Sequence, residues 1–209
     1  MILMILRKRL IISISIFISI IILTLTSCGG ALKFKNDGTT GNLIDEENGR
    51  YYIYCGSYLR AAEIKAEVYA KGDQKEKLHE ITGVDPAKWL SENISMGIAL
   101  LFREQSEEEP TLEEFETEII HITMTEEITL SVGAITDRED IETIVNDYMN
   151  NKETSLPDYV AENLTLYFQS QKYKGIYYVL QYFLDDKNKS YLYDRWTKRC
   201  VACSVNLFG

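Results

Sequence analysis

The chain has 209 residues, a formal net charge of −10 and 45% hydrophobic residues. This composition can bury a core, which excludes a disordered acidic tail, and the length favours a single domain. Nucleic-acid backbones are bound by clustered Lys and Arg, whereas here the basic residues are scattered among a larger number of carboxylates. We therefore expect no nucleic-acid partner.

The first 27 residues have the organisation of a secretory signal. Arg7, Lys8 and Arg9 form a charged start, and an apolar run follows over residues 10–25. A spanning helix needs about 17 to 25 apolar residues, so the run falls just short of that length. The 27 residues hold three basic and no acidic side chains, so their removal leaves a formal charge of −13.

The apolar run ends in Leu25-Thr26-Ser27-Cys28, which resembles the lipobox of bacterial lipoproteins. The resemblance implies that Cys28 receives a diacylglyceryl group and that a signal peptidase, which needs the small residues, cuts between Ser27 and Cys28. Two or more acyl chains would anchor the protein permanently, because each buried methylene adds about 0.8 kcal/mol. The expected location is the cell membrane, with the domain on the extracytoplasmic side. An uncleaved hydrophobic anchor is the alternative.

Residues 28–49 contain five glycines among polar residues and show no apolar periodicity. That composition is typical of a flexible tether. We therefore divide the chain into a signal peptide over 1–27, a tether over 28–49 and a single domain over 50–209.

Strand signals dominate the first half of this domain, with one helix start. Asp85-Pro86 combines an N-cap residue with proline at the first helical position. Residues 104–118 hold eight carboxylates, which indicates a solvated loop, with a calcium site as the alternative. The predicted elements are a strand over 51–55, a segment over 61–71 that fits either helix or strand, a short helix over about 87–92 and a strand over 94–102.

The second half contains the clearest helix. Thr136 and Glu139 form a capping box, and one apolar stripe follows, so the helix should run over about 137–150. The stripe consists of Ile141, Ile144, Val145, Tyr148 and Met149. Strands are predicted over 118–124, 128–132, 164–170, 176–184 and 190–196. The expected fold class is α+β, an antiparallel meander with one main amphipathic helix and one short helix.

The last eighty residues carry a second, weaker resemblance. The pattern over Ile135 to Val145, the Lys-x-Thr loop at Lys152 and the Tyr-rich strands after it are similar to small uncharacterised lipoproteins of Gram-positive bacteria. This chain departs from that group at its end, where Cys200 and Cys203 replace an aromatic tail. The resemblance supports the fold and export and implies no functional site.

Three cysteines remain besides the lipidation residue: Cys55, Cys200 and Cys203. A disulfide from Cys55 to one of the other two and three buried free thiols are the alternatives. Only His79 and His121 could serve as catalytic bases, and both are expected on the solvated surface. We expect no catalytic residue, no metal site and no cofactor.

Tyrosine is the unusual feature, because eight of the fourteen lie between residues 159 and 193. Tyr178, Tyr182, Tyr191 and Tyr193 fall on two adjacent predicted strands. They are interpreted either as a binding face, since tyrosine adds contact area and a polar tip, or as ordinary sheet packing. The binding interpretation predicts a non-catalytic, lipid-anchored module with a protein, peptide or glycan partner in the cell envelope. The alternative is an envelope enzyme that uses Cys200 or Cys203 as a nucleophile.

Overall fold

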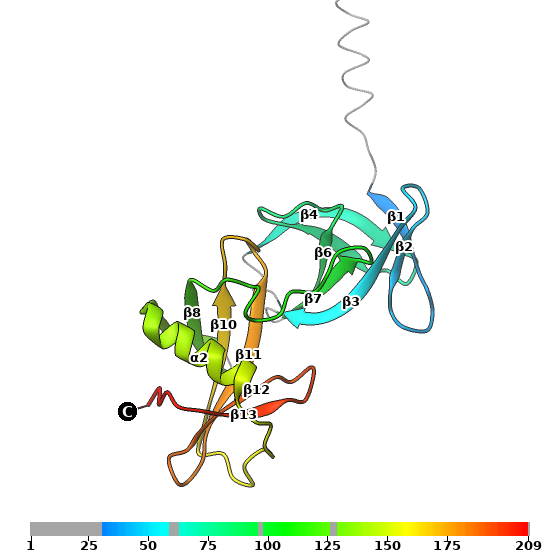
Figure 1. The fold of residues 1–209 in the computed structure, drawn as a ribbon. Coiled ribbons are helices and arrows are strands. Elements are labelled where there is room, and N and C mark those ends of the chain that lie inside the picture. The colour runs from blue at the N-terminus through cyan, green and yellow to red at the C-terminus, as the bar shows by residue number, and fades with distance from the viewer. Residues whose placement is uncertain (1–30, 59–62, 96–97, 126–128, 209) are drawn as a thin grey trace, which may run out of the picture. The chain divides into compact units, whose positions relative to one another are not determined.

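The computed structural model describes residues 31–58, 63–95, 98–125 and 129–208, and the residues from Lys33 onward form one compact unit (Figure 1). The first seven strands are β1 (Leu32–Asn36), β2 (Leu43–Asp45), β3 (Arg50–Tyr58), β4 (Ile64–Gly72), β5 (Lys77–Ile81), β6 (Trp89–Ser95) and β7 (Ile98–Glu104). They are followed by β8 (Ile119–Thr125), β9 (Thr129–Ile135), helix α2 (Arg138–Asn150), β10 (Glu162–Gln169), β11 (Tyr177–Leu184), β12 (Ser190–Tyr193) and β13 (Cys200–Cys203).

These strands form two sheets, so the protein is mostly β and the predicted α+β class is wrong. The first seven strands close into a barrel in the order β1-β2-β3-β7-β6-β5-β4. The other six form an antiparallel sheet in the order β13-β12-β11-β10-β8-β9. Among the described residues, α2 is the one helix. Two sheets of short strands, rather than one meander, therefore carry the core.

The barrel was missed because two of its strands lie in the segment assigned to a tether. β1 and β2 are short and flanked by glycine turns, but Phe34 and Leu43 are buried inside the barrel. The ring of Phe34 stacks on Tyr52 of β3 with centroids 5.4 Å apart. The folded part therefore begins by Leu32 rather than at residue 50.

The short helix predicted over 87–92 is also absent, because its N-terminal signal makes a single turn. The Asp85 carboxylate accepts a hydrogen bond from the Ala87 N–H at 2.9 Å. The Asp85 backbone carbonyl accepts from the N–H groups of Lys88 and Trp89. The chain then extends as β6, in which Leu90 is buried. The strand predicted over 94–102 is divided between the end of β6 and β7, which pair with each other, and β4 begins within the ambiguous segment 61–71.

Helix α2 is present near the predicted position, although Asp137 rather than Thr136 caps it. The Asp137 side chain accepts from the backbone N–H groups of Glu139 and Asp140. The apolar stripe of the helix is buried in a core shared with the six-stranded sheet, whose members include Leu166, Leu180, Leu192 and Val201. Burying each such side chain stabilises the fold by about 1.5 to 3 kcal/mol.

The two edges of the six-stranded sheet differ. Beside β13 the chain after α2 forms a bridge from Glu153 to Val201, and the Thr154 N–H donates to the Cys200 carbonyl at 2.8 Å. At the other end of the strand order, β9 pairs with β8, and none of the described strands pairs with its second side. One edge is therefore covered and the other open.

Candidate binding face

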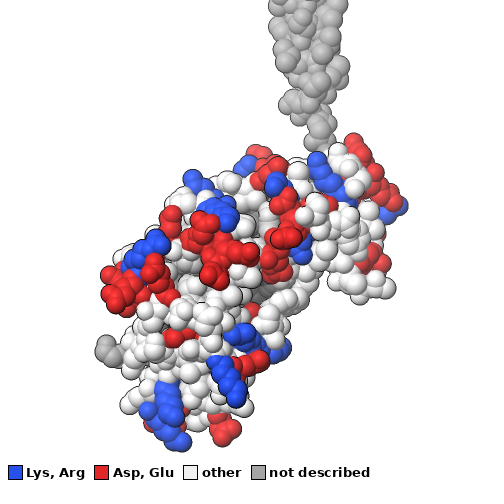
Figure 2. All heavy atoms as spheres, in the orientation of Figure 1, with Lys and Arg blue, Asp and Glu red and all other residues white. Residues whose placement is uncertain are grey.

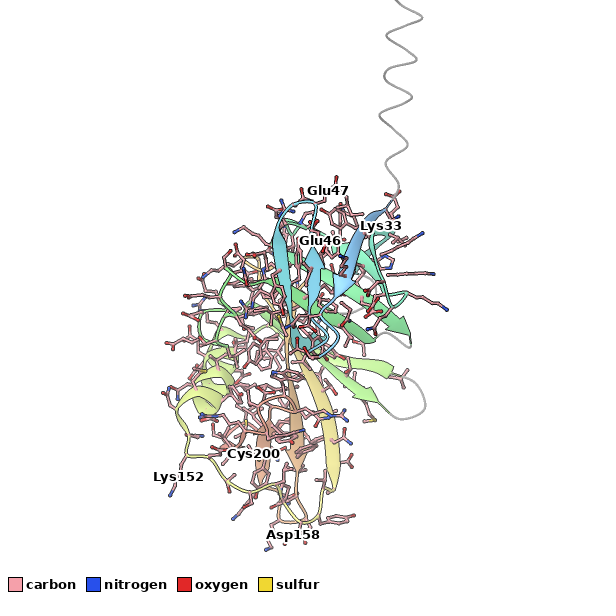
Figure 3. The ribbon with its side chains drawn as sticks, turned by 90° about the vertical axis from the view of Figure 1, so that its right-hand side faces the viewer. Lys33, Glu46, Glu47, Lys152, Asp158 and Cys200 are labelled. Atoms are coloured by element: carbon pink, nitrogen blue, oxygen red, sulfur yellow. The ribbon has the colours of Figure 1, made fainter. Side chains whose placement is uncertain are left out.

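One face of the six-stranded sheet carries no charged side chain. Figure 3 shows α2 on one side of the strands, and the strand registers give the residues that point the other way, since directly paired residues share a face. We call this set the outer face. Along β8 and β10 to β13 it comprises Ile119, His121, Thr123, Asn163, Thr165, Tyr167, Gln169, Tyr177, Val179, Gln181, Phe183, Tyr191, Tyr193, Cys200 and Ala202. None of the fifteen is Asp, Glu, Lys or Arg. Three of them, Thr123, Tyr177 and Cys200, are buried, and the Tyr177 hydroxyl donates to the Glu63 carboxylate at 2.8 Å.

The four predicted tyrosines do not share this face. Tyr182 pairs with Leu192, so the flanking Tyr191 and Tyr193 point to the opposite side of the sheet. Tyr182 is fully buried, with its hydroxyl bonded to the C-terminal segment, and burial raises the pKa of Tyr178 far above its ordinary value. The structure therefore separates Tyr178 and Tyr182, which belong to the core, from Tyr191 and Tyr193, which belong to the outer face.

Three further residues join the two outer tyrosines. Phe183 pairs with Tyr191, and its ring lies 6.0 Å from that of Tyr193. Gln181 pairs with Tyr193, and Tyr167 lies two strands away on β10. All five are half-buried, as expected for neighbouring side chains on an open sheet. The sequence contained one signal for this arrangement. Gln181 is the only amide in the apolar run of β11, so it marks the alternate positions that point to the outer face.

The ring of Tyr191 is held in place by a buried carboxylate. The Tyr191 hydroxyl donates to Asp185 at 3.1 Å. The Asp185 carboxylate also accepts from the backbone N–H groups of Lys189 at 2.8 Å and Lys187 at 2.9 Å. These hydrogen bonds, that of Lys189 foremost, lower the pKa of Asp185. Tyr191 therefore presents a preorganised ring, which reduces the entropic cost of binding a ligand.

A hollow of about 470 Å³ adjoins this ring. Two outer-face residues, Tyr191 and Ala202, contribute to its lining, and Lys189 is its one charged member. The other lining residues are Thr154, Asn188, Ser190, Cys203, Ser204 and Asn206. This volume lies within the range of about 300 to 1,000 Å³ typical of small-ligand sites, and the amide and hydroxyl groups suit an uncharged, hydrogen-bonding ligand.

The three cysteines of the domain are buried free thiols. Burial raises the pKa of Cys55 and of Cys203 to about 12, and it also raises that of Cys200. Cys200 pairs with Tyr193 and Cys203 with Ser190, so the two point to opposite faces of the sheet. A thiolate nucleophile needs a lowered pKa and exposure, so neither Cys200 nor Cys203 suits that role.

The histidines also take structural positions. His79 is nearly buried, contrary to the expectation of a solvated side chain, and its Nδ1 lies 2.9 Å from the Lys65 carbonyl. His121 lies on the outer face, where its Nε2 contacts the side-chain oxygen of Gln169 at 2.5 Å. Within the described ranges, no group of three or more His, Cys, Asp or Glu side chains is arranged to hold a metal ion.

The residues predicted for lipidation and signal cleavage, Leu25, Thr26, Ser27 and Cys28, lie outside the described residues. In the part of the chain that the structure describes, no helix is long and apolar enough to span a membrane. The lipid anchor therefore stays a prediction from the sequence.

Comparison with known proteins gives no relative. No family model matches the chain, and no curated protein and no solved structure is detectably similar to it. The functional interpretation accordingly rests on the geometry of the outer face and its hollow.

Proposed function

We propose that the protein is a lipid-anchored, extracytoplasmic binding module that uses its outer face to bind an uncharged glycan of the cell envelope. Cys28 would carry the lipid, and three residues would then separate it from Leu32, where β1 begins. The four steps from Cys28 to Leu32 span at most about 14 Å, at about 3.6 Å per residue. The module would act close to the membrane surface.

The observation that carries the proposal is the absence of Asp, Glu, Lys and Arg from the outer face. Charged residues make up 26% of the chain, and the part after residue 27 has a formal charge of −13. Strands without charge give a charged ligand no ion pair and cost an uncharged ligand no desolvated charge. The two carboxylates that reach this face, Asp185 and Glu63, already accept hydrogen bonds from Tyr191 and Tyr177. The aromatic rings offer apolar area to the faces of sugar rings, while Gln181 and the polar hollow offer hydrogen bonds.

The residue composition of the outer face fits a glycan better than a protein partner. Energetically dominant residues of protein interfaces are enriched in Trp, Tyr and Arg, and the outer face has tyrosines but neither Trp nor Arg. The buried thiols with raised pKa speak against the enzyme alternative.

The test titrates the detergent-extracted full chain with three neutral tetrasaccharides: chitotetraose, cellotetraose and maltotetraose. We expect at least one to bind, and the double variant Phe183→Ala with Tyr191→Ala to weaken that binding by about tenfold, or about 1.4 kcal/mol. Tyr159→Ala is the matched control, because Tyr159 is 63% exposed and lies outside the outer face.

Two outcomes would overturn the proposal. Binding of none of the three sugars refutes the neutral-glycan assignment, and equal loss in the control refutes the assignment to the outer face. Circular dichroism of each variant shows whether it is folded. If the double variant unfolds, Tyr191→Leu, which retains apolar volume without the aromatic ring, replaces it.

A further inference from the structure

The open edge of the six-stranded sheet points to a second interaction site. In β9, residues 130–134 are all exposed, with Leu130 at 52% and Val132 at 51%. The strand Thr129–Ile135 contains no Asp, Glu, Lys, Arg or Pro. Natural edge strands are commonly protected by charge, proline or a covering segment. The sheet covers its β13 edge in this way, and the barrel is closed.

One protective feature is present in β9, and it limits the size of the partner. Ile122 pairs with Gly133 and Thr123 pairs with Ser131, which leaves Val132 as the extra residue of a bulge. A bulge bends the strand and increases its twist. The edge therefore suits one short added strand better than a growing stack of strands.

The chain around β9 is acidic, and this selects the charge of the partner. After the strand come the exposed side chains of Asp137, Glu139 and Asp140, and Figure 2 shows acidic atoms gathered at this start of α2. In the sequence, Glu126 and Glu127 precede the strand. Arg138, the one basic residue near this end, is paired with Glu142 at 2.6 Å.

We propose that β9 binds an extended peptide segment as a seventh strand, and that this segment has apolar or β-branched residues in its centre and basic residues at the end beside the start of α2. Backbone hydrogen bonds to the open edge would supply affinity, while Leu130 and Val132 would contact the added side chains. The basic end would meet the exposed carboxylates of Asp137, Glu139 and Asp140.

A second copy of this chain is disfavoured as the occupant. Both copies would carry the same large negative charge, and like charges repel. A peptide with a basic end turns this repulsion into attraction.

The test uses two dye-labelled peptides with the same centre of alternating threonine and valine. One has two lysines at each end and the other has two glutamates, and both are titrated against the full chain in non-ionic detergent by fluorescence anisotropy. We expect the lysine peptide to bind at least about tenfold more tightly at low salt, and this difference to shrink at high salt.

The variant pair Leu130→Lys with Val132→Lys should weaken binding of the lysine peptide at least about tenfold. Leu156→Lys with Tyr159→Lys is the matched control, since these side chains are 44% and 63% exposed outside β9, and it should bind within about twofold of the wild type. Equal loss in the control, equal binding of the two peptides or binding of neither overturns the proposal. If the wild type forms a dimer and the β9 variant does not, the β9 edge binds a second copy of the chain, and the peptide assignment is wrong.

Discussion

The hydroxyl of Tyr182 offers a sharp test of the division between core and outer face. The side chain is fully buried, and its oxygen donates to the Val205 carbonyl at 3.1 Å while accepting from the Leu207 N–H at 3.0 Å. The hydroxyl of Ser190 lies 2.6 Å away and completes the set as a second donor. Tyr182→Phe removes all three hydrogen bonds and leaves two backbone groups of the C-terminal segment without this partner.

At about 1 kcal/mol for each hydrogen bond, the loss of three predicts a destabilisation of about 3 kcal/mol. Tyr193→Phe is the control, because within the described part of the chain no hydrogen bond reaches the Tyr193 hydroxyl, and its cost should stay below about 0.5 kcal/mol. Urea unfolding followed by circular dichroism measures both values. Equal costs for the two variants, or a cost below about 0.5 kcal/mol for Tyr182→Phe, would refute the assignment of Tyr182 to the core.

Three further predictions concern titratable groups. Burial raises the pKa of Glu92, so the folded state holds this proton more tightly than the unfolded state and stability falls as the pH rises past 4.5. Glu92→Gln should flatten that decline in thermal melts recorded from about pH 4 to pH 7, and an unchanged slope would contradict it. Cys55 and Cys203, with pKa about 12, should react with a thiol reagent at pH 8 only after unfolding, and fast labelling of the native protein would count against their burial. The Asp147 carboxylate accepts from the Ser204 N–H at 2.6 Å and from its hydroxyl at 2.7 Å, so Asp147→Ala should cost about 1 to 3 kcal/mol and expose the last residues to carboxypeptidase. Digestion at the wild-type rate would contradict that role.

The sequence predicted elements that have strong local signals. Helix α2 has an N-cap and a clear apolar stripe, and β10 alternates Leu164, Leu166 and Phe168 with more polar residues. These patterns depend on neighbours within the same segment, so they can be recognised without knowledge of the tertiary structure.

The barrel could not be predicted in the same way, because its closure depends on contacts between distant segments. β1 and β2 are five and three residues long, and their glycine turns resemble a tether. Burial of Phe34 and Leu43 follows only when the strands that surround them are in place. The turn at Asp85 shows the same limit, since its local signal for a helix is overridden once the chain joins the barrel as β6.

The candidate site was predicted only in part, because the register of β11 could not be recognised from the sequence. In β11 nearly every residue is apolar or aromatic, so the sequence did not show which alternate set faces the core. Pairing of Tyr182 with Leu192 decides it, and this pairing places Phe183 rather than Tyr182 beside Tyr191 and Tyr193. A shift of one residue would exchange the two faces.

The proposed function depends first on export and on lipid attachment at Cys28. The most direct test is the intact mass of the protein extracted from membranes, compared with a Cys28→Ala variant. The account predicts a wild-type chain that begins at Cys28 and carries the added mass of a diacylglyceryl group, and a variant that keeps residues 1–27. A wild-type chain that retains residues 1–27 without lipid would contradict the account.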